Sequence, residues 1–130
     1  VPARTTGFHS NEAKTFLGLT IPPGTGAAES LRLALDRLFN HPNVGPFFAK
    51  QMIQRLVTSN PSPAYVARIA AVFANNGQGQ RGDLSAVFKA ILIDEEALNT
   101  ANVSNANFGK LREPVLRFVQ LARTFGARSN

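Results

Sequence analysis

The stretch that decides the fold class is Ser62-Pro63-Ala64-Tyr65-Val66-Ala67-Arg68-Ile69-Ala70-Ala71-Val72-Phe73 (SPAYVARIAAVF). Ser62 is a favoured N-cap residue, and Pro63 stands at the first helical position, where its fixed φ already suits a helix. Apolar side chains then recur at three-and-four spacing, at Val66, Ile69, Ala70 and Phe73. Gly77 supplies a left-handed stop. The stretch therefore predicts an amphipathic helix.

Similar punctuation on both sides of this stretch predicts four more helices. His41-Pro42 ends one of them, because the residue before a proline is pushed out of the α region. Asp83 can cap another, and Pro114 and Gly126 bracket the last. We expect helices at about 28–40, 44–58, 84–92 and 112–125, a frayed turn at 94–97 and an exposed Asn-rich loop at 99–107.

Residues 1–27 form the irregular part of the chain. Segments 6–9 and 14–17 flank a polar turn-like stretch and are predicted to pair as a small hairpin. We therefore expect an all-α fold, an antiparallel array of about five helices over residues 28–130, behind an irregular or hairpin segment at 1–27.

Composition bounds the class of protein. The 130 residues are 44% hydrophobic and include ten Phe, enough for one globular domain with a real core. There is no cysteine, which excludes disulfides, thiolate zinc sites and Cys nucleophiles. No apolar run reaches the roughly 18 residues of a membrane span. The chain opens with Val1-Pro2-Ala3-Arg4, neither a start Met nor a signal peptide, so we expect a piece of a longer chain.

The net charge of +6 raises the question of a polyanion partner. The basic residues are scattered singly from Arg4 to Arg128, with no run of three and no stripe alternating with aromatics. This pattern favours a solvated basic surface. It predicts no specific nucleic-acid binding, and it leaves weak attraction to polyanions as an alternative.

One glycine-rich segment, residues 77–82, matches the dinucleotide fingerprint G-x-G-x-x-G. That fingerprint needs a strand before it and a helix after it, whereas a predicted helix precedes this one, so a helix–helix connector is favoured. Asp83 follows where a P-loop requires Lys, and twelve residues counted from Asn75 or Asn76 do not reach the Glu of an EF-hand. Arg81-Gly82-Asp83 spells the adhesion tripeptide, a match that chance explains.

Few polar residues are candidates for a site. His9 lies near Glu12, but two ligands fall short of a metal site, and no G-x-S-x-G elbow is present. Two cations and a carboxylate crowd the helix start at 110–114, where a structural salt bridge and a ligand-binding Arg both remain open. We expect no catalytic residue, metal or cofactor, and the ligand-binding candidates are His9, Arg81, Asp83, Arg112 and Glu113.

Several segments together resemble the bacterial family of domain of unknown function 1800 (DUF1800). They are Phe8-His9 through Gly18, Leu38 to Phe47, Leu56 to Val66, Arg81-Gly82-Asp83-Leu84, and Gly109-Lys110-Leu111-Arg112-Glu113-Pro114. The resemblance implies a much longer parent, exported or periplasmic, with a possible partner protein. It implies no activity. Ser10 stands where family members often have Asp, which weakens a His–Asp pair at His9.

Three functions follow as hypotheses. The first is a non-catalytic helical module that packs against the N-terminal remainder of its own chain, another protein or a second copy. The second is a share of an active site completed by that remainder, which leaves enzymatic activity open. The third is weak polyanion binding. The apolar helix faces favour the first.

Overall fold

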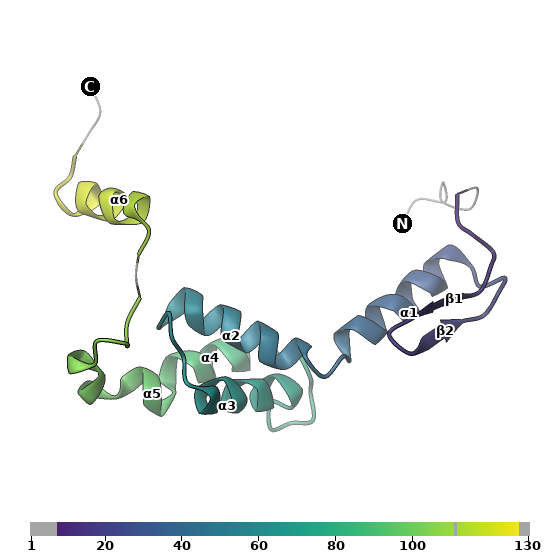
Figure 1. Ribbon diagram of the computed structural model, residues 1–130, viewed down its shortest axis with the longest axis horizontal. Helices are drawn as coiled ribbons and strands as arrows, with labels where there is room; N and C mark the ends of the chain where they lie inside the picture. The colour runs from purple at the N-terminus through teal and green to yellow at the C-terminus, as the bar shows by residue number, and fades with distance from the viewer. Residues whose placement is uncertain (1–7, 111, 128–130) are drawn as a thin grey trace. The chain divides into compact units, whose positions relative to one another are not determined.

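The computed structural model describes residues 8–110 and 112–127. The chain divides into two compact units, Val1–Val44 and Gly45–Asn130. Figure 1 labels the helices and strands of both. Within the described ranges, no helix is both long and apolar enough to cross a membrane.

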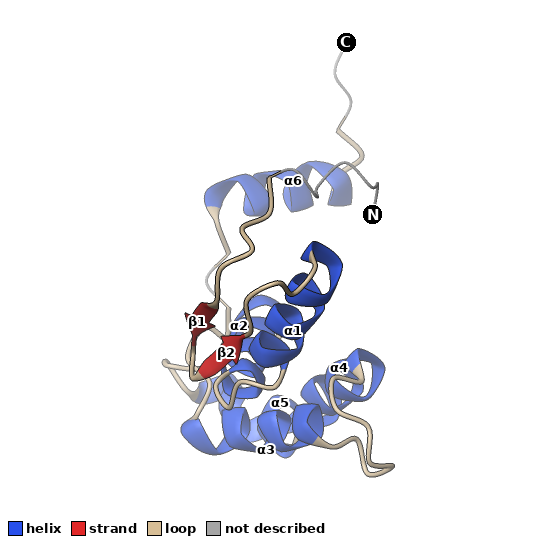
Figure 2. Cartoon of the chain, turned by 90° about the vertical axis from the view of Figure 1, so that its right-hand side faces the viewer, coloured by secondary structure: helices blue, strands red, loops and turns tan. Residues whose placement is uncertain are grey.

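A two-stranded antiparallel hairpin opens the first unit (Figure 2, red). Strand β1 (Lys14–Phe16) pairs with β2 (Leu19–Ile21), with Lys14 opposite Ile21. The two residues between the strands, Leu17 and Gly18, have φ values of 46° and 73°. Positive φ at both positions gives a tight turn whose twist matches that of the strands.

The hairpin was predicted correctly, but its pairing was predicted wrongly. Segment 14–17 pairs with 19–21 rather than with 6–9, of which residues 6 and 7 lie outside the described part of the chain. The tight turn begins with Leu17, a residue type that rarely adopts the left-handed conformation, so the sequence carried a weak turn signal there.

Helix α1 (Ala27–Phe39) packs against β2 within the first unit. Ile21 is buried. The Arg37 guanidinium donates to the Leu17 carbonyl, with Nε at 2.7 Å, and so ties the helix to the hairpin turn. Helix α1 thus groups with the hairpin; a helical domain over the whole of 28–130 stays a prediction.

Helices α2 (Val44–Leu56), α3 (Pro63–Ala74) and α4 (Leu84–Ile93) build the core of the second unit. The cap predicted for α3 is present, since Ser62 Oγ accepts a hydrogen bond of 3.1 Å from Tyr65 N. One face of each helix is buried, through Ala49, Ile53, Tyr65, Ile69, Phe73, Val87 and Ile91.

An aromatic contact joins these three helices. The Phe48 ring of α2 lies 5.7 Å from that of Phe73 on α3 and 6.2 Å from that of Phe88 on α4. Gly45 allows the close approach of α2 to α3, because an added Cβ would meet the Ala70 carbonyl oxygen and the Phe73 ring at 3.4 Å. A side chain at position 45 would therefore crowd this contact.

Three further elements follow: α5 (Glu95–Leu98), the 3₁₀ helix η2 (Thr100–Ser104) and α6 (Pro114–Thr124). The predicted loop at 99–107 thus contains a helical turn that the Asn-rich composition concealed. Gly109 N donates to the buried Thr58 Oγ1 at 3.1 Å, which fastens the end of this segment beside α2. The all-α class is confirmed, with five described helices of ten residues or more and an N-terminal hairpin.

The Tyr65 hydroxyl, buried in the core, supplies a test of this packing. It donates to the Ile91 carbonyl, one of the last four carbonyls of α4, which lack partners within the helix. Tyr65→Phe would leave that carbonyl unpaired, and we expect the free energy of unfolding to fall by about 1–3 kcal/mol in urea titrations followed by circular dichroism.

Ser85→Ala is the matched control, since it removes an exposed hydroxyl from α4 and should change stability by less than about 0.5 kcal/mol. Equal stability of Tyr65→Phe and the wild type would contradict the role given to this hydrogen bond.

Candidate functional site

A bidentate ion pair between the half-buried Arg68 and the buried Asp94 is the central contact of a polar cluster in the second unit. Arg68 on α3 donates through Nε and Nη2 to the two carboxylate oxygens of Asp94, at 2.8 and 2.7 Å. Asp94 follows α4 and caps α5 by accepting from Glu96 N at 2.9 Å. One carboxylate therefore connects α3 to the junction of α4 and α5.

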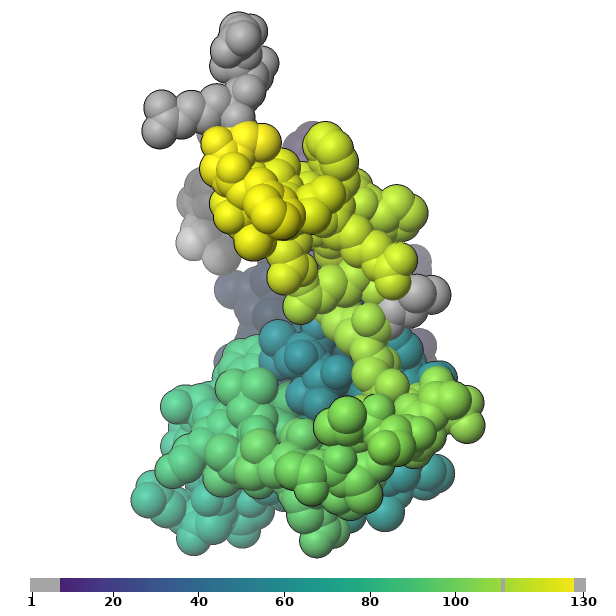
Figure 3. Space-filling view, turned by 90° about the vertical axis from the view of Figure 1, so that its left-hand side faces the viewer, coloured from purple at the N-terminus to yellow at the C-terminus, as the bar shows by residue number. Residues whose placement is uncertain are grey.

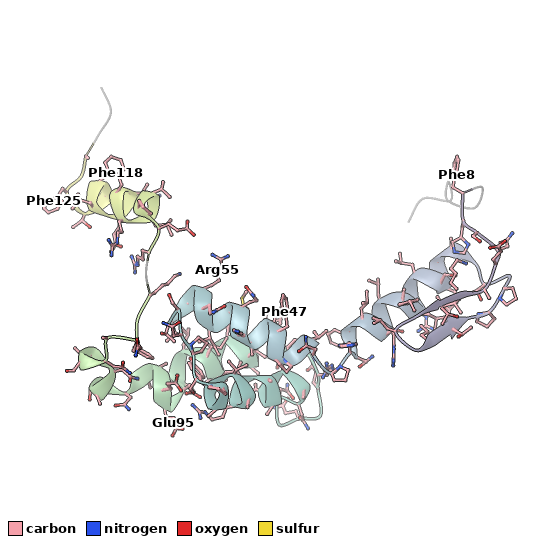
Figure 4. The ribbon with its side chains drawn as sticks, in the orientation of Figure 1. Phe8, Phe47, Arg55, Glu95, Phe118 and Phe125 are labelled. Atoms are coloured by element: carbon pink, nitrogen blue, oxygen red, sulfur yellow. The ribbon has the colours of Figure 1, made fainter. Side chains whose placement is uncertain are left out.

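Two further carboxylates approach the same guanidinium. Glu96 accepts from both the backbone N–H (3.0 Å) and the hydroxyl of Ser62, and lies 3.9 Å from Arg68. Glu95 Oε1 lies 3.2 Å from Arg68 Nη1, but its side chain is largely exposed and points outward from α5 (Figure 4). We call Ser62, Arg68, Asp94, Glu95 and Glu96 the Arg68 cluster.

Asp94, Arg68 and Tyr65 each keep one protonation state around neutral pH. Hydrogen bonds from Arg68 hold the pKa of Asp94 below its ordinary value, against the effect of burial. The same carboxylates raise the pKa of Arg68. Burial, with the Asp94 and Glu96 charges adding to it, raises the pKa of Tyr65 to about 12. None of these three groups would exchange a proton near pH 7, which argues against general acid–base chemistry by them.

A cavity of about 480 Å³ opens beside the cluster. It lies between the start of α3, α5 and the segment that carries η2, whose surface appears in green in the lower part of Figure 3. Nine of its ten lining residues are polar or charged, and the exception is Phe108. The lining residues are Asn60, Ser62, Arg68, Glu95, Glu96, Asn99, Asn102, Asn105, Asn107 and Phe108.

The predicted candidates at the glycine-rich loop have structural contacts. Asp83 accepts from Ala86 N at 3.1 Å as the N-cap of α4, and from Asn76 Nδ2 at 2.7 Å. The Asn76 bond, with those from the backbone, lowers the pKa of Asp83. The Arg81 guanidinium lies over the Phe73 ring, 5.1 Å from its centre.

The other predicted candidates lie elsewhere. Arg112 and Glu113 line a separate cavity of about 240 Å³. Ser59, which precedes α3, also lines this cavity, whereas Arg81 and Asp83 come after the end of α3. His9 belongs to the first unit. The candidates thus fall into the pair Arg81 and Asp83, the pair Arg112 and Glu113, and His9 by itself, and ligand binding by any of the five stays a prediction.

The sequence did not predict that the residues of the Arg68 cluster lie close together. Arg68 occupies the polar side of the predicted α3, where a solvated cation is the ordinary expectation. The acidic run 94–96 was a signal, but it suggested only a frayed turn. Among the described residues, no three His, Asp or Glu side chains are grouped so as to hold a metal ion.

The Arg68–Asp94 pair should make the free energy of unfolding depend on pH. Folding lowers the pKa of Asp94, so the pair stabilises the fold fully above the ordinary value of 3.8 and loses this effect as the pH falls through the lowered pKa. Asp94→Asn keeps an acceptor for Glu96 N but removes the charge. We expect its free energy of unfolding to lie about 1–3 kcal/mol below that of the wild type at neutral pH, and the deficit to shrink in acid.

The control is Asp36→Asn, which removes one of the two carboxylates paired with the exposed Arg32, the one at 2.7 Å, and should cost less than about 1 kcal/mol. Urea titrations over a pH series measure both variants. A deficit for Asp94→Asn that is absent at neutral pH, or that persists unchanged in acid, would show that this ion pair does not carry the stability assigned to it.

Comparison with known protein families gives a match over nearly the whole chain. Residues 2–130 match the family described as "Protein of unknown function (DUF1800)". No curated protein and no solved structure shows significant similarity to the chain. The match covers the segments on which the family resemblance was recognised, together with the hairpin, the helices and the Arg68 cluster between them. The chain belongs to the DUF1800 family of proteins of unknown function.

Proposed function

We propose that this chain is a helical interaction module whose C-terminal helix α6 packs onto an apolar surface supplied by the rest of a longer parent chain or by another protein. The observation that carries the proposal is that α6 is amphipathic and yet contains no buried residue.

The apolar stripe of α6 is exposed along its length. Phe118 is 70% exposed and Phe125, directly after the helix, is 77% exposed, and both project from α6 in Figure 4. Leu121, three residues after Phe118 and four before Phe125, continues the same side of the helix and is exposed as well. Neighbouring exposed aromatic and aliphatic side chains of this kind are typical of an interaction surface.

The length of α6 strengthens this argument. Helices shorter than about 12–15 residues are marginal in water by themselves, and most helical stability in proteins comes from packing of the apolar face. Helix α6 has 11 residues and buries none of them. A partner surface would therefore stabilise the helix as well as cover its apolar stripe.

The polar side of α6 suggests the character of that surface. Arg117 and Arg123 lie on the helix, and Glu113, directly before it, is the only acidic residue in the sequence from 112 to 130. An apolar groove with an acidic rim would complement this arrangement. The remainder of the longer, exported parent that the family resemblance implies is the first candidate to provide it.

Helix α1 offers a second exposed apolar face, which supports the same reading of the chain. Leu31, Leu35 and Leu38 recur along it at helical spacing, and each is about half exposed. The face belongs to the first unit, so the two units each present an apolar helix surface.

Replacement of both aromatic rings tests the proposal. We expect the wild type to bind an apolar dye such as anilinonaphthalene sulfonate, or to self-associate in sedimentation velocity as its concentration rises. Phe118→Gln with Phe125→Gln should strongly reduce that signal, because glutamine preserves helix propensity while removing the apolar contact area.

Phe8→Gln is the matched control, since Phe8 is 97% exposed but lies in the other unit. It should leave the signal of the wild type unchanged. A wild type that stays monomeric and binds no dye would refute the proposal, as would a double variant that behaves like the wild type.

A further inference from the structure

The 480 Å³ cavity beside the Arg68 cluster is independent of α6 and of the interaction proposed for it. We propose that this cavity binds a neutral saccharide, recognised through its hydroxyl groups. Four properties of the cavity support this: its size, the hydrogen bonds that join its lining segments, its charge and its unused hydrogen-bonding groups.

The size of the cavity and the hydrogen bonds that join its lining segments suit a small ligand. Its volume falls within the roughly 300–1,000 Å³ range of small-molecule sites. Asn102 Nδ2 donates to the Glu96 carbonyl at 2.8 Å, and Asn60 Nδ2 donates to the Asn107 carbonyl at 3.2 Å. With the two bonds from Ser62 to Glu96, these contacts hold α3, α5 and the following segment together before any ligand arrives.

The charge of the lining disfavours an anionic ligand. The single cation, Arg68, is held by Asp94, while Glu95 and Glu96 add two negative charges at the cavity. A phosphate or carboxylate would therefore meet repulsion. A divalent cation is also disfavoured, because the described residues provide no group of three or more acidic or histidine ligands.

The asparagine side chains offer both donors and acceptors. Asn99 Oδ1 accepts from Ala101 N and Asn105 Oδ1 accepts from Asn107 N, both at 2.9 Å, so each keeps its Nδ2 group as a donor. Asn60 and Asn102 use Nδ2 in the bonds above, so each keeps Oδ1 as an acceptor.

This mixture matches a polyol better than other small molecules. Each sugar hydroxyl both donates and accepts, so a ring with several of them can satisfy neighbouring amide donors and acceptors at once. Phe108, which is only partly covered, adds a flat apolar ring against which the C–H face of a sugar can pack. The geometry therefore favours a neutral sugar ring.

Ligand-observed saturation-transfer NMR on the full chain tests the proposal. The neutral probes are glucose, N-acetylglucosamine, maltose and cellobiose, and glucose 6-phosphate is the anionic probe. We expect saturation of at least one neutral probe and weaker binding of the phosphorylated sugar.

The variant Asn99→Asp with Asn105→Asp removes the two amide donors while keeping both Oδ1 acceptors, and with them the local turns. It should weaken binding by about tenfold or more. Phe108→Leu should weaken it as well while leaving the amides intact. Asn75→Asp is the matched control: Asn75 Oδ1 accepts from Gly77 N and Gly79 N in a similar turn away from the cavity, so affinity should not change.

Three results would overturn the inference. They are the absence of saturation for every neutral probe, tighter binding of glucose 6-phosphate than of glucose, and unchanged affinity in the Asn99→Asp, Asn105→Asp variant when its circular dichroism spectrum matches that of the wild type.

Discussion

The Arg68–Asp94 ion pair is the contact on which the second unit depends. It joins α3 to the junction of α4 and α5 with two hydrogen bonds, and its carboxylate caps α5 at the same time. Asp94 lies where the chain passes from α4 into α5, and Arg68 lies in the middle of α3, so the pair fixes the α4–α5 junction against α3. A charge-assisted bidentate pair suits this task, because its two parallel bonds fix orientation as well as distance.

Around this pair, the chain is held in place mainly by hydrogen bonds and ion pairs, rather than by apolar packing. The core of α2, α3 and α4 is held by buried Ile, Val and Phe side chains, whereas the segment after α4 is held by side-chain amides, carboxylates and backbone groups. A hydrogen bond within the protein replaces hydrogen bonds to water, so its net contribution to stability is small unless its geometry is well defined. The segment from α5 to Gly109 is therefore ordered by specific bonds, and the cavity is a product of that order.

The two proposed binding surfaces of the second unit, the cavity beside the Arg68 cluster and helix α6, also differ in being polar and apolar, respectively. The cavity beside the Arg68 cluster keeps unused amide donors on Asn99 and Asn105, whereas α6 keeps its apolar stripe exposed. The first property is suited to holding a small polar ligand in place, and the second to adding a partner surface. The two proposals thus address separate parts of the molecule and do not depend on each other.

The helices were predictable from sequence because their signals are local. Ser62-Pro63 and Asp83 mark helix starts through bonds that span three residues, and the apolar periodicity of α3 spans only one helix. The hairpin partner and the Arg68 cluster were not predictable in this way. The turn at Leu17 depends on a backbone conformation that leucine seldom adopts, and Arg68 and Asp94 are 26 residues apart.

By itself, then, the sequence determined the all-α class, the positions of most helix ends and the family to which the chain belongs. Only the tertiary structure decided which polar residues meet. Helix propensity and capping act between near neighbours, so the sequence states them directly. The pairing of Arg68 with Asp94 depends on how α3 and α4 pack, and that packing follows from the joint burial of many apolar side chains rather than from any one spacing.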